Sequence, residues 1–164
     1  RMLRKPVALG LGVALVTFLL DQASKYLLRT FVVPQSWDVV YVLPVFNLNH
    51  AWNYGVSFSM FAHTDDSRRW ALIAMAGALT ALVGWWLRSA PNKLSGLSYG
   101  FIMGGAVGNI CDRIVHGAVF DFLQFHLDRY YWPSFNLADS AIFVGVALLL
   151  WENRPDFCRK RSIT

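Results

Sequence analysis

Charged side chains are scarce in this sequence. Lysine, arginine, aspartate and glutamate make up 15% of its 164 residues, whereas an ordinary soluble domain carries about 25%. Hydrophobic residues make up 55% and the mean hydropathy is +0.39. A chain with this balance has too few charges for the surface of a soluble domain, so we expect its surroundings to be largely lipid.

Cysteine and the common catalytic motifs are also rare or missing. The two cysteines, Cys111 and Cys158, provide neither a disulfide framework nor metal-ligand spacing. The sequence has no H-E-x-x-H zinc motif and no G-x-S-x-G nucleophile motif. The histidines lack ligand spacing, although His116 and His126 lie near Asp112 and Asp121 along the chain, which leaves a metal as a minor alternative. We therefore expect no metal and no cofactor.

The net charge of +5 does not indicate nucleic-acid binding, because the basic residues lie mostly at the ends of apolar segments. Four such segments are long enough, or nearly so, to cross a bilayer, which takes about 20 residues per helix. They cover approximately residues 7–28, 70–87, 94–115 and 137–151. The first could be mistaken for a signal peptide, but no small-residue cleavage site follows "VTFLL", so we expect a retained span.

The distribution of charge predicts how these spans are oriented. With four spans, both termini lie on one side, which holds nine Lys or Arg and only two acids; the other side holds six Lys or Arg and eight Asp. The positive-inside rule then places both termini in the cytoplasm. Aromatic residues that include Tyr130, Tyr131 and Trp132 are expected at the outer interface.

The longer connections, about residues 31–68 and 116–136, fall on the outer side. "WDVVYVLPVFNLNHAWN" is rich in β-branched and aromatic residues and suits edge strands or a small hairpin. "YGVSFSMFAH" is either a short amphipathic helix on the membrane surface or an irregular segment. The expected fold is a mainly α membrane protein with a four-transmembrane-helix bundle, a small extracytoplasmic β element and a surface amphipathic helix. It forms one integral membrane domain over residues 1–164.

Polar residues within the apolar segments are costly and mark candidate sites. Asp21 and Lys25 in "DQASK" are four residues apart on one helix face, so they can form a structural ion pair. Gly100, Gly104 and Gly108 recur every four residues and predict a smooth face for helix packing.

Asn109 and Arg113 follow this glycine face, with Asp112 beside them. This cluster either anchors the helix at the interface or grips a substrate backbone or lipid headgroup. Asn53 in "NYGVSF" lies, on pattern alone, in an ordinary turn.

Two aspartates stand among apolar neighbours in "GAVFDFLQFHLDRYYWPSFNLADS". Asp121 and Asp139 are too far apart in sequence to share a helix face, so they can meet only if the chain turns outside the membrane and re-enters it. Asn136 is a plausible N-cap with Asp139 three residues on, an arrangement that resembles a capping box and needs no catalytic role. The helix N-terminus would favour a charged Asp139, and burial would keep Asp121 protonated. Two carboxylates that share a low-dielectric site would resemble an aspartic-protease pair.

Four motifs in order resemble lipoprotein signal peptidase, also called signal peptidase II: "DQASK", "NYGVSF", "GGAVGNICDRIVHGAVFDFL" and "FNLADS". The resemblance implies a multi-pass aspartyl endopeptidase of the bacterial inner membrane, with its active site toward the outer leaflet. Its substrate would be a prolipoprotein cut just before a diacylglyceryl-modified cysteine. The family's catalytic aspartates correspond to Asp121 and Asp139. Its supporting residues correspond to Asp21, Lys25, Asn53, Asn109, Asp112, Arg113 and Asn136. Membrane lipids and globomycin-type cyclic peptides are further expected partners, and nucleic acid is not; we expect a monomer.

Two other classes of protein stay open on the residues alone. Intramembrane Asp and Lys also occur in proton relays, so a small proton-coupled transporter or a lipid-binding membrane protein is the alternative. The glycine face could instead belong to a structural assembly subunit. The polar residues gather toward one leaflet and form no path across the membrane, which argues against transport.

Overall fold

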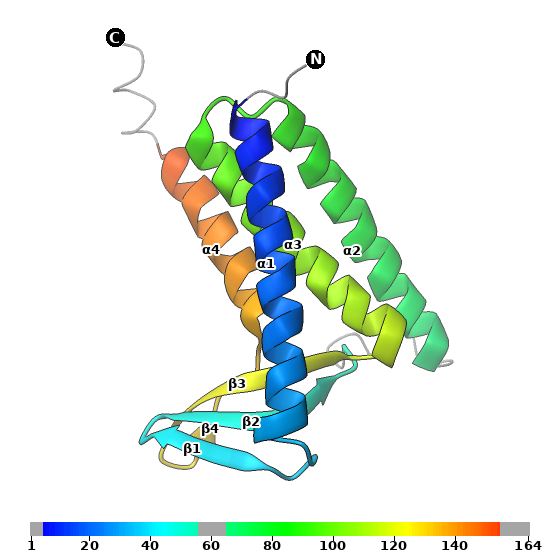
Figure 1. Ribbon diagram of the computed structural model, residues 1–164, viewed down its shortest axis with the longest axis vertical. Coiled ribbons are helices and arrows are strands. Elements are labelled where there is room, and N and C mark those ends of the chain that lie inside the picture. The colour runs from blue at the N-terminus through cyan, green and yellow to red at the C-terminus, as the bar shows by residue number, and fades with distance from the viewer. Residues whose placement is uncertain (1–4, 56–64, 155–164) are drawn as a thin grey trace.

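The computed structural model describes residues 5–55 and 65–154. Helices cover all four apolar segments that the sequence predicts. The helices are α1 (Lys5–Leu27), which a π-helix η1 (Leu28–Val32) extends, α2 (Asp65–Arg88), α3 (Lys93–His116) and α4 (Leu137–Glu152). Figure 1 shows these helices as an elongated bundle with a small sheet at one end, opposite the start of α1. The segment "YGVSFSMFAH" lies almost entirely outside the described residues.

Helix α3 packs against each of the other three helices. Its glycine face allows a close approach of α1, as the sequence predicts. A Cβ atom added to Gly104 would lie 2.5 Å from the carbonyl oxygen of Ala14, and one added to Gly100 would lie 2.5 Å from the carbonyl oxygen of Gly10. Farther along the helix, a Cβ on Gly108 would lie 2.5 Å from the carboxylate of Asp21. The glycines therefore let α1 bring its polar residues up to α3.

The sheet has the strand order β1-β2-β3-β4, and every pair is antiparallel. Strands β1 (Val39–Leu43) and β2 (Phe46–Asn53) lie within the predicted β segment. Strands β3 (Val119–Leu127) and β4 (Tyr130–Tyr131) come from the connection between α3 and α4, for which the sequence analysis predicted no strand. β3 forms by pairing with β2. Because this partner strand lies far away in the sequence, no local pattern could have predicted β3.

One end of β3 is held against the helices. Phe120 and Phe122 are buried together with Val33, which follows η1. Since successive side chains on a strand point to opposite faces, Asp121 lies on the other face from these two rings. The hydrophobic contact with the end of α1 thus sets the orientation of Asp121.

Two of the helical segments, Lys5–Val32 and Asp66–Arg88, are long and apolar enough to cross a membrane by length and composition. Many of their large hydrophobic side chains are exposed, among them Leu15, Leu19, Leu79 and Trp85. These exposed apolar helices agree with the lipid environment that the composition predicts.

Candidate active site

Asp121 on β3 and Asp139 in the first turn of α4 are joined through two asparagine side chains. Nδ2 of Asn136 donates to Oδ1 of Asp121 at 2.7 Å, and Nδ2 of Asn109 donates to Oδ1 of Asp139 at 2.8 Å. The two amides also contact each other, since Nδ2 of Asn136 lies 3.2 Å from Oδ1 of Asn109. The two aspartates therefore share one hydrogen-bonded cluster although they come from a strand and a helix.

The position of Asp139 follows from the way α4 begins. Asn136 is the N-cap: its Oδ1 accepts from the backbone N–H of Asp139 at 2.9 Å, and its own N–H donates to Oδ2 of Asp139 at 3.3 Å. This reciprocal arrangement is the capping box that the sequence predicts. Together with the bond from Asn109, it leaves Asp139 with a hydrogen-bond donor on each carboxylate oxygen.

The environment of Asp121 favours the protonated acid. Its residue surface is only 2% exposed. Burial, followed by the negative charge of Asp139, raises the pKa of Asp121 from 3.8 to about 7. The side chains of Asn136, which donates a hydrogen bond to Asp121, and of Asn53 oppose this rise in pKa but do not cancel it. The environments of the two carboxyl groups therefore differ, which is the arrangement that separates an acid from a base.

Lys25 occupies the centre of a buried ionic cluster behind this pair. Its Nζ lies 2.8 Å from Oδ2 of Asp21 and 2.9 Å from Oδ2 of Asp112, and it donates to Oδ1 of Asn109 at 3.2 Å. The predicted pair within α1 is thus confirmed, and Asp112 joins it from α3. The ammonium balances two buried carboxylates, each of which would be costly alone.

The two carboxylates that contact Lys25 also hold the two elements on which Asp121 and Asp139 lie. Oδ1 of Asp21 accepts from the backbone N–H of Ala138 in the first turn of α4 at 2.9 Å. Oδ2 of Asp112 accepts from the backbone N–H of Phe120 on β3 at 3.1 Å. The cluster therefore links the start of α4, which carries Asp139, to the residue next to Asp121.

The remaining predicted residues, Asn53 and Arg113, lie at the same place. Asn53 ends β2, and its side chain lies close enough to Asp121 to lower the pKa of that carboxyl and so oppose the effect of burial. Arg113 lies close enough to both aspartates for electrostatic attraction, and its Nη1 donates to the Asn109 carbonyl at 3.4 Å. The structure thus brings all nine residues of the sequence-based site into one connected cluster.

Among residues 5–55 and 65–154, no three His, Cys, Asp or Glu side chains form a group that could hold a metal ion.

A family model described as Signal peptidase (SPase) II matches residues 13–153. The chain belongs to the signal peptidase II family. It is 43% identical to the lipoprotein signal peptidase of Alteromonas mediterranea over 143 residues, which cover 85% of this chain and 77% of that protein. It is 44% identical to the lipoprotein signal peptidase of Aeromonas hydrophila over 144 residues, with 87% and 86% of the two chains covered.

Two solved structures of bacterial membrane enzymes have the same fold. One has a TM-score of 0.77 and 23% identity, with 90% of this chain and 93% of that chain covered. The other has a TM-score of 0.73 and 23% identity, with 86% and 84% covered. The signal peptidase II chain therefore shares the fold of these enzymes, and its exposed apolar helices fit a membrane location, as its composition predicts.

Membership of the signal peptidase II family confirms the expected activity class. The chain is an aspartic peptidase, a hydrolase that removes signal peptides from prolipoproteins. The family does not favour the alternative of a transporter or lipid-binding protein.

One polar residue of this signal peptidase II site was missed in the sequence. Nε2 of Gln22 donates to Oδ2 of Asp21 at 3.1 Å and to Oδ1 of Asp112 at 3.0 Å, so it spans the two carboxylates that Lys25 neutralises. The sequence contained a sign of this role, because Gln22 is the second residue of "DQASK", a polar stretch inside an apolar segment.

Proposed function

We propose that Asp121 and Asp139 are the catalytic pair of a single integral membrane domain. It removes the signal peptide from diacylglyceryl-modified prolipoproteins by cutting before the lipid-modified cysteine. The observation that carries this assignment is the hydrogen-bonded cluster in which Asn109 and Asn136 join the two carboxyl groups. An aspartic peptidase needs two carboxyl groups in one site with different charge states, and the deeper burial of Asp121 together with the hydrogen bonds to Asp139 supports this assignment.

The raised pKa of Asp121 supports different catalytic roles for the carboxyl groups of Asp121 and Asp139. With a pKa of about 7, Asp121 keeps its proton in much of the protein at neutral pH and can donate a hydrogen bond to the scissile carbonyl oxygen. Asp139 accepts two hydrogen bonds at the start of α4 and serves as the carboxylate that takes a proton from the attacking water. The oxygen of that water then adds to the carbonyl carbon. When the tetrahedral intermediate collapses, the proton held by Asp139 passes to the leaving nitrogen.

Arg113 and Asn53 are proposed to hold the substrate at the pair. Within the described part of the chain, the only hydrogen bond of the Arg113 side chain is the long one to the Asn109 carbonyl. Its remaining donors are available to carbonyl oxygens of the peptide or of the ester-linked lipid. Globomycin-type cyclic peptides would compete for the same donors. We further propose that the enzyme is a monomer.

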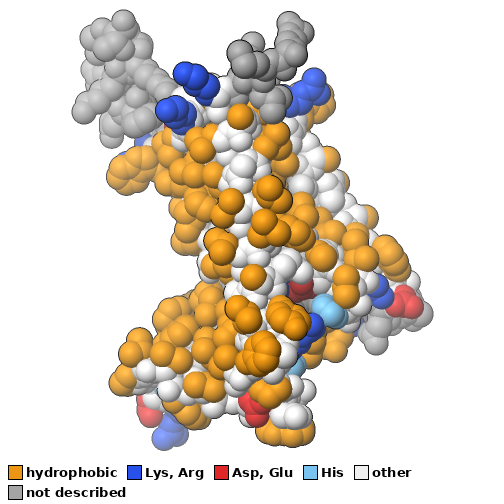
Figure 2. All heavy atoms as spheres, viewed as in Figure 1, with side chains coloured by type: hydrophobic (Ala, Val, Ile, Leu, Met, Phe, Trp, Pro, Cys, Tyr) orange, Lys and Arg blue, Asp and Glu red, His pale blue; other side chains and the backbone are white. Residues whose placement is uncertain are grey.

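The proposed topology has four spans, with both termini in the cytoplasm of a bacterial cell and the pair toward the outer leaflet of the inner membrane. Lys5, Arg88, Lys93 and Arg154 lie at helix ends away from the sheet. Figure 2 shows blue Lys and Arg side chains at that end of the bundle. A concentration of basic residues at one end favours its cytoplasmic placement.

The experiment that tests the assignment measures cleavage of a lipid-modified precursor by Asp121→Asn and Asp139→Asn. Each variant should abolish cleavage while the protein stays folded in the membrane, and the double variant should be little worse than either single one. Asp128→Asn, at an exposed turn, is the matched control and should cleave normally. Near-normal turnover of either single variant would contradict the assignment, as would loss of activity in EDTA that zinc restores.

A further inference from the structure

The end of the sheet farthest from the bundle carries large hydrophobic side chains on its surface. Figure 1 shows that the strands extend sideways beyond the helices. At that end Leu127, Tyr130 and Trp132 are 71%, 78% and 68% exposed. Soluble proteins rarely leave such a group of large apolar side chains in water, which makes this surface a candidate contact for lipid or protein.

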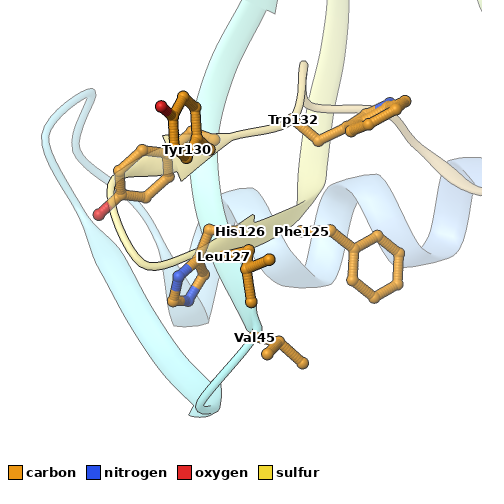
Figure 3. Close-up of a pocket in the computed structure, with 7 residues that line it drawn as sticks. Val45, Phe125, His126, Leu127, Tyr130 and Trp132 are labelled. Carbon is orange, nitrogen blue, oxygen red and sulfur yellow. The ribbon is translucent and has the colours of Figure 1, made fainter.

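A cavity of about 580 Å³ opens among these side chains. Figure 3 shows Val45, Phe125, Leu127, Tyr130 and Trp132 arranged around it. Its surface is almost wholly apolar, which suits a hydrocarbon chain better than a polar peptide or an ion. We call the surface formed by these five residues the aromatic rim.

The charged residues of this end are confined to the turn between β3 and β4. Asp128 and Arg129 have side chains that are 86% and 87% exposed and lie 3.9 Å apart. They stand directly between Leu127 and Tyr130, and Asp128 has a positive φ of 52° at the turn. In Figure 2 the projecting end is covered by hydrophobic side chains, and its charged ones lie at the side away from the helices. Apolar and charged groups at this end are therefore segregated within four consecutive residues.

This segregation matches the water–lipid boundary of a membrane. Tyrosine and tryptophan rings favour the headgroup level, where one part of the ring is in lipid and the polar atom is in water. Figure 2 shows hydrophobic side chains both on the projecting end and along the helices, where Leu15 of α1 is 59% exposed. A bilayer that surrounds the helices would therefore reach the rim as well.

We propose that the aromatic rim inserts into the outer leaflet of the bilayer and that lipid acyl chains occupy its cavity. The proposal rests on the topology proposed above, with the sheet on the outer side. Asp121 lies on β3, the strand that ends at Leu127, so anchoring of the rim fixes the depth of Asp121 relative to the membrane. A substrate held by its own lipid then presents its scissile bond at a matching depth.

The test is site-directed spin labelling in vesicles of phosphatidylethanolamine and phosphatidylglycerol. Cys111 and Cys158 are first replaced by alanine, and single cysteines are then placed at Leu127, Asp128 and Tyr130. Labels at 127 and 130 should collide more often with oxygen, which concentrates in lipid, than with a water-soluble nickel chelate. The label at 128, one residue away, should show the reverse order and is the matched control.

A further label at Leu15 on α1 tests the proposed topology separately from the anchoring of the rim. If that label is in lipid while those at 127 and 130 show the same preference as 128, the rim lies in water and the anchoring proposal is wrong. If the labels at 127 and 130 are shielded from both reagents, protein covers the rim and the lipid assignment is equally wrong. If the label at Leu15 is itself in water, the proposed topology fails, and the anchoring proposal fails with it. None of these labels touches the catalytic pair, so precursor cleavage reports on the proposed activity independently.

Discussion

Replacing Asp121 by asparagine should stabilise the protein at alkaline pH while it abolishes cleavage. The folded environment raises the pKa of this carboxyl from 3.8 to about 7. A difference of roughly three pKa units corresponds to about 4 kcal/mol, because each unit is worth about 1.4 kcal/mol. The neutral asparagine has the shape of the protonated acid and still accepts a hydrogen bond, so it avoids the cost of a buried charge.

The sign of the pH dependence follows from proton binding. Between about pH 4 and pH 7 the folded state retains a proton that the unfolded state has released. The contribution of Asp121 to the free energy of unfolding is therefore highest below the unfolded pKa, falls as the pH rises through this window, and is lowest above the folded pKa of about 7. About two of the three pKa units lie between pH 5 and pH 7. The advantage of Asp121→Asn over the wild type should thus grow by about 3 kcal/mol between pH 5 and pH 8.

Thermal unfolding in one detergent at both pH values measures this change. For a chain of this size, about 3 kcal/mol corresponds to a rise in the relative Tm on the order of 10 °C. Asp128→Asn is the control: its carboxylate is exposed at a turn, so its Tm relative to the wild type should be the same at pH 5 and pH 8. A Tm difference for Asp121→Asn that does not change with pH, or that becomes less favourable at pH 8, would refute the reasoning.

Three further substitutions test the neighbouring contacts. Arg113→Lys should lower kcat/KM for the lipid-modified precursor by about tenfold or more without changing the Tm, because lysine lacks the planar fork that binds two oxygens; an unchanged kcat/KM would make Arg113 a structural residue. Lys25→Met should lower the free energy of unfolding by about 3–5 kcal/mol, since it leaves two buried carboxylates without their cation, whereas Lys93→Met at an exposed position should have almost no effect on chemical denaturation. Gly104→Ala should lower the free energy of unfolding by about 1–3 kcal/mol, because the added Cβ would meet the backbone of α1. Gly77→Ala is the control: its Cβ would meet nothing within 4 Å, so this variant should be neutral or slightly stabilising. Equal effects of the two substitutions would contradict the packing argument.

Local patterns in the sequence were sufficient for the helices and for contacts within them. The Asp21–Lys25 pair and the capping box of Asn136 with Asp139 join residues four and three positions apart. The geometry of one helical turn brings such residues together whatever the rest of the chain does. The same holds for the glycine face of α3, whose spacing identified a packing surface, although not the helix that packs there.

Only the tertiary structure decided which of these local features meet. The hydrogen bond from Ala138 to Asp21 joins residues 117 positions apart, and the one from Lys25 to Asn109 joins residues 84 positions apart. β3, the strand that carries Asp121, forms because β2 pairs with it. From the apolar sequence of this segment alone, a strand could not be told from an irregular turn. Contacts of this kind depend on how α1, α3 and α4 pack and on the register of the sheet, and no periodicity in the sequence encodes these. The sequence by itself therefore determined which residues are chemically suited to the site, and the packing of distant segments decided that Asp121 and Asp139 share it.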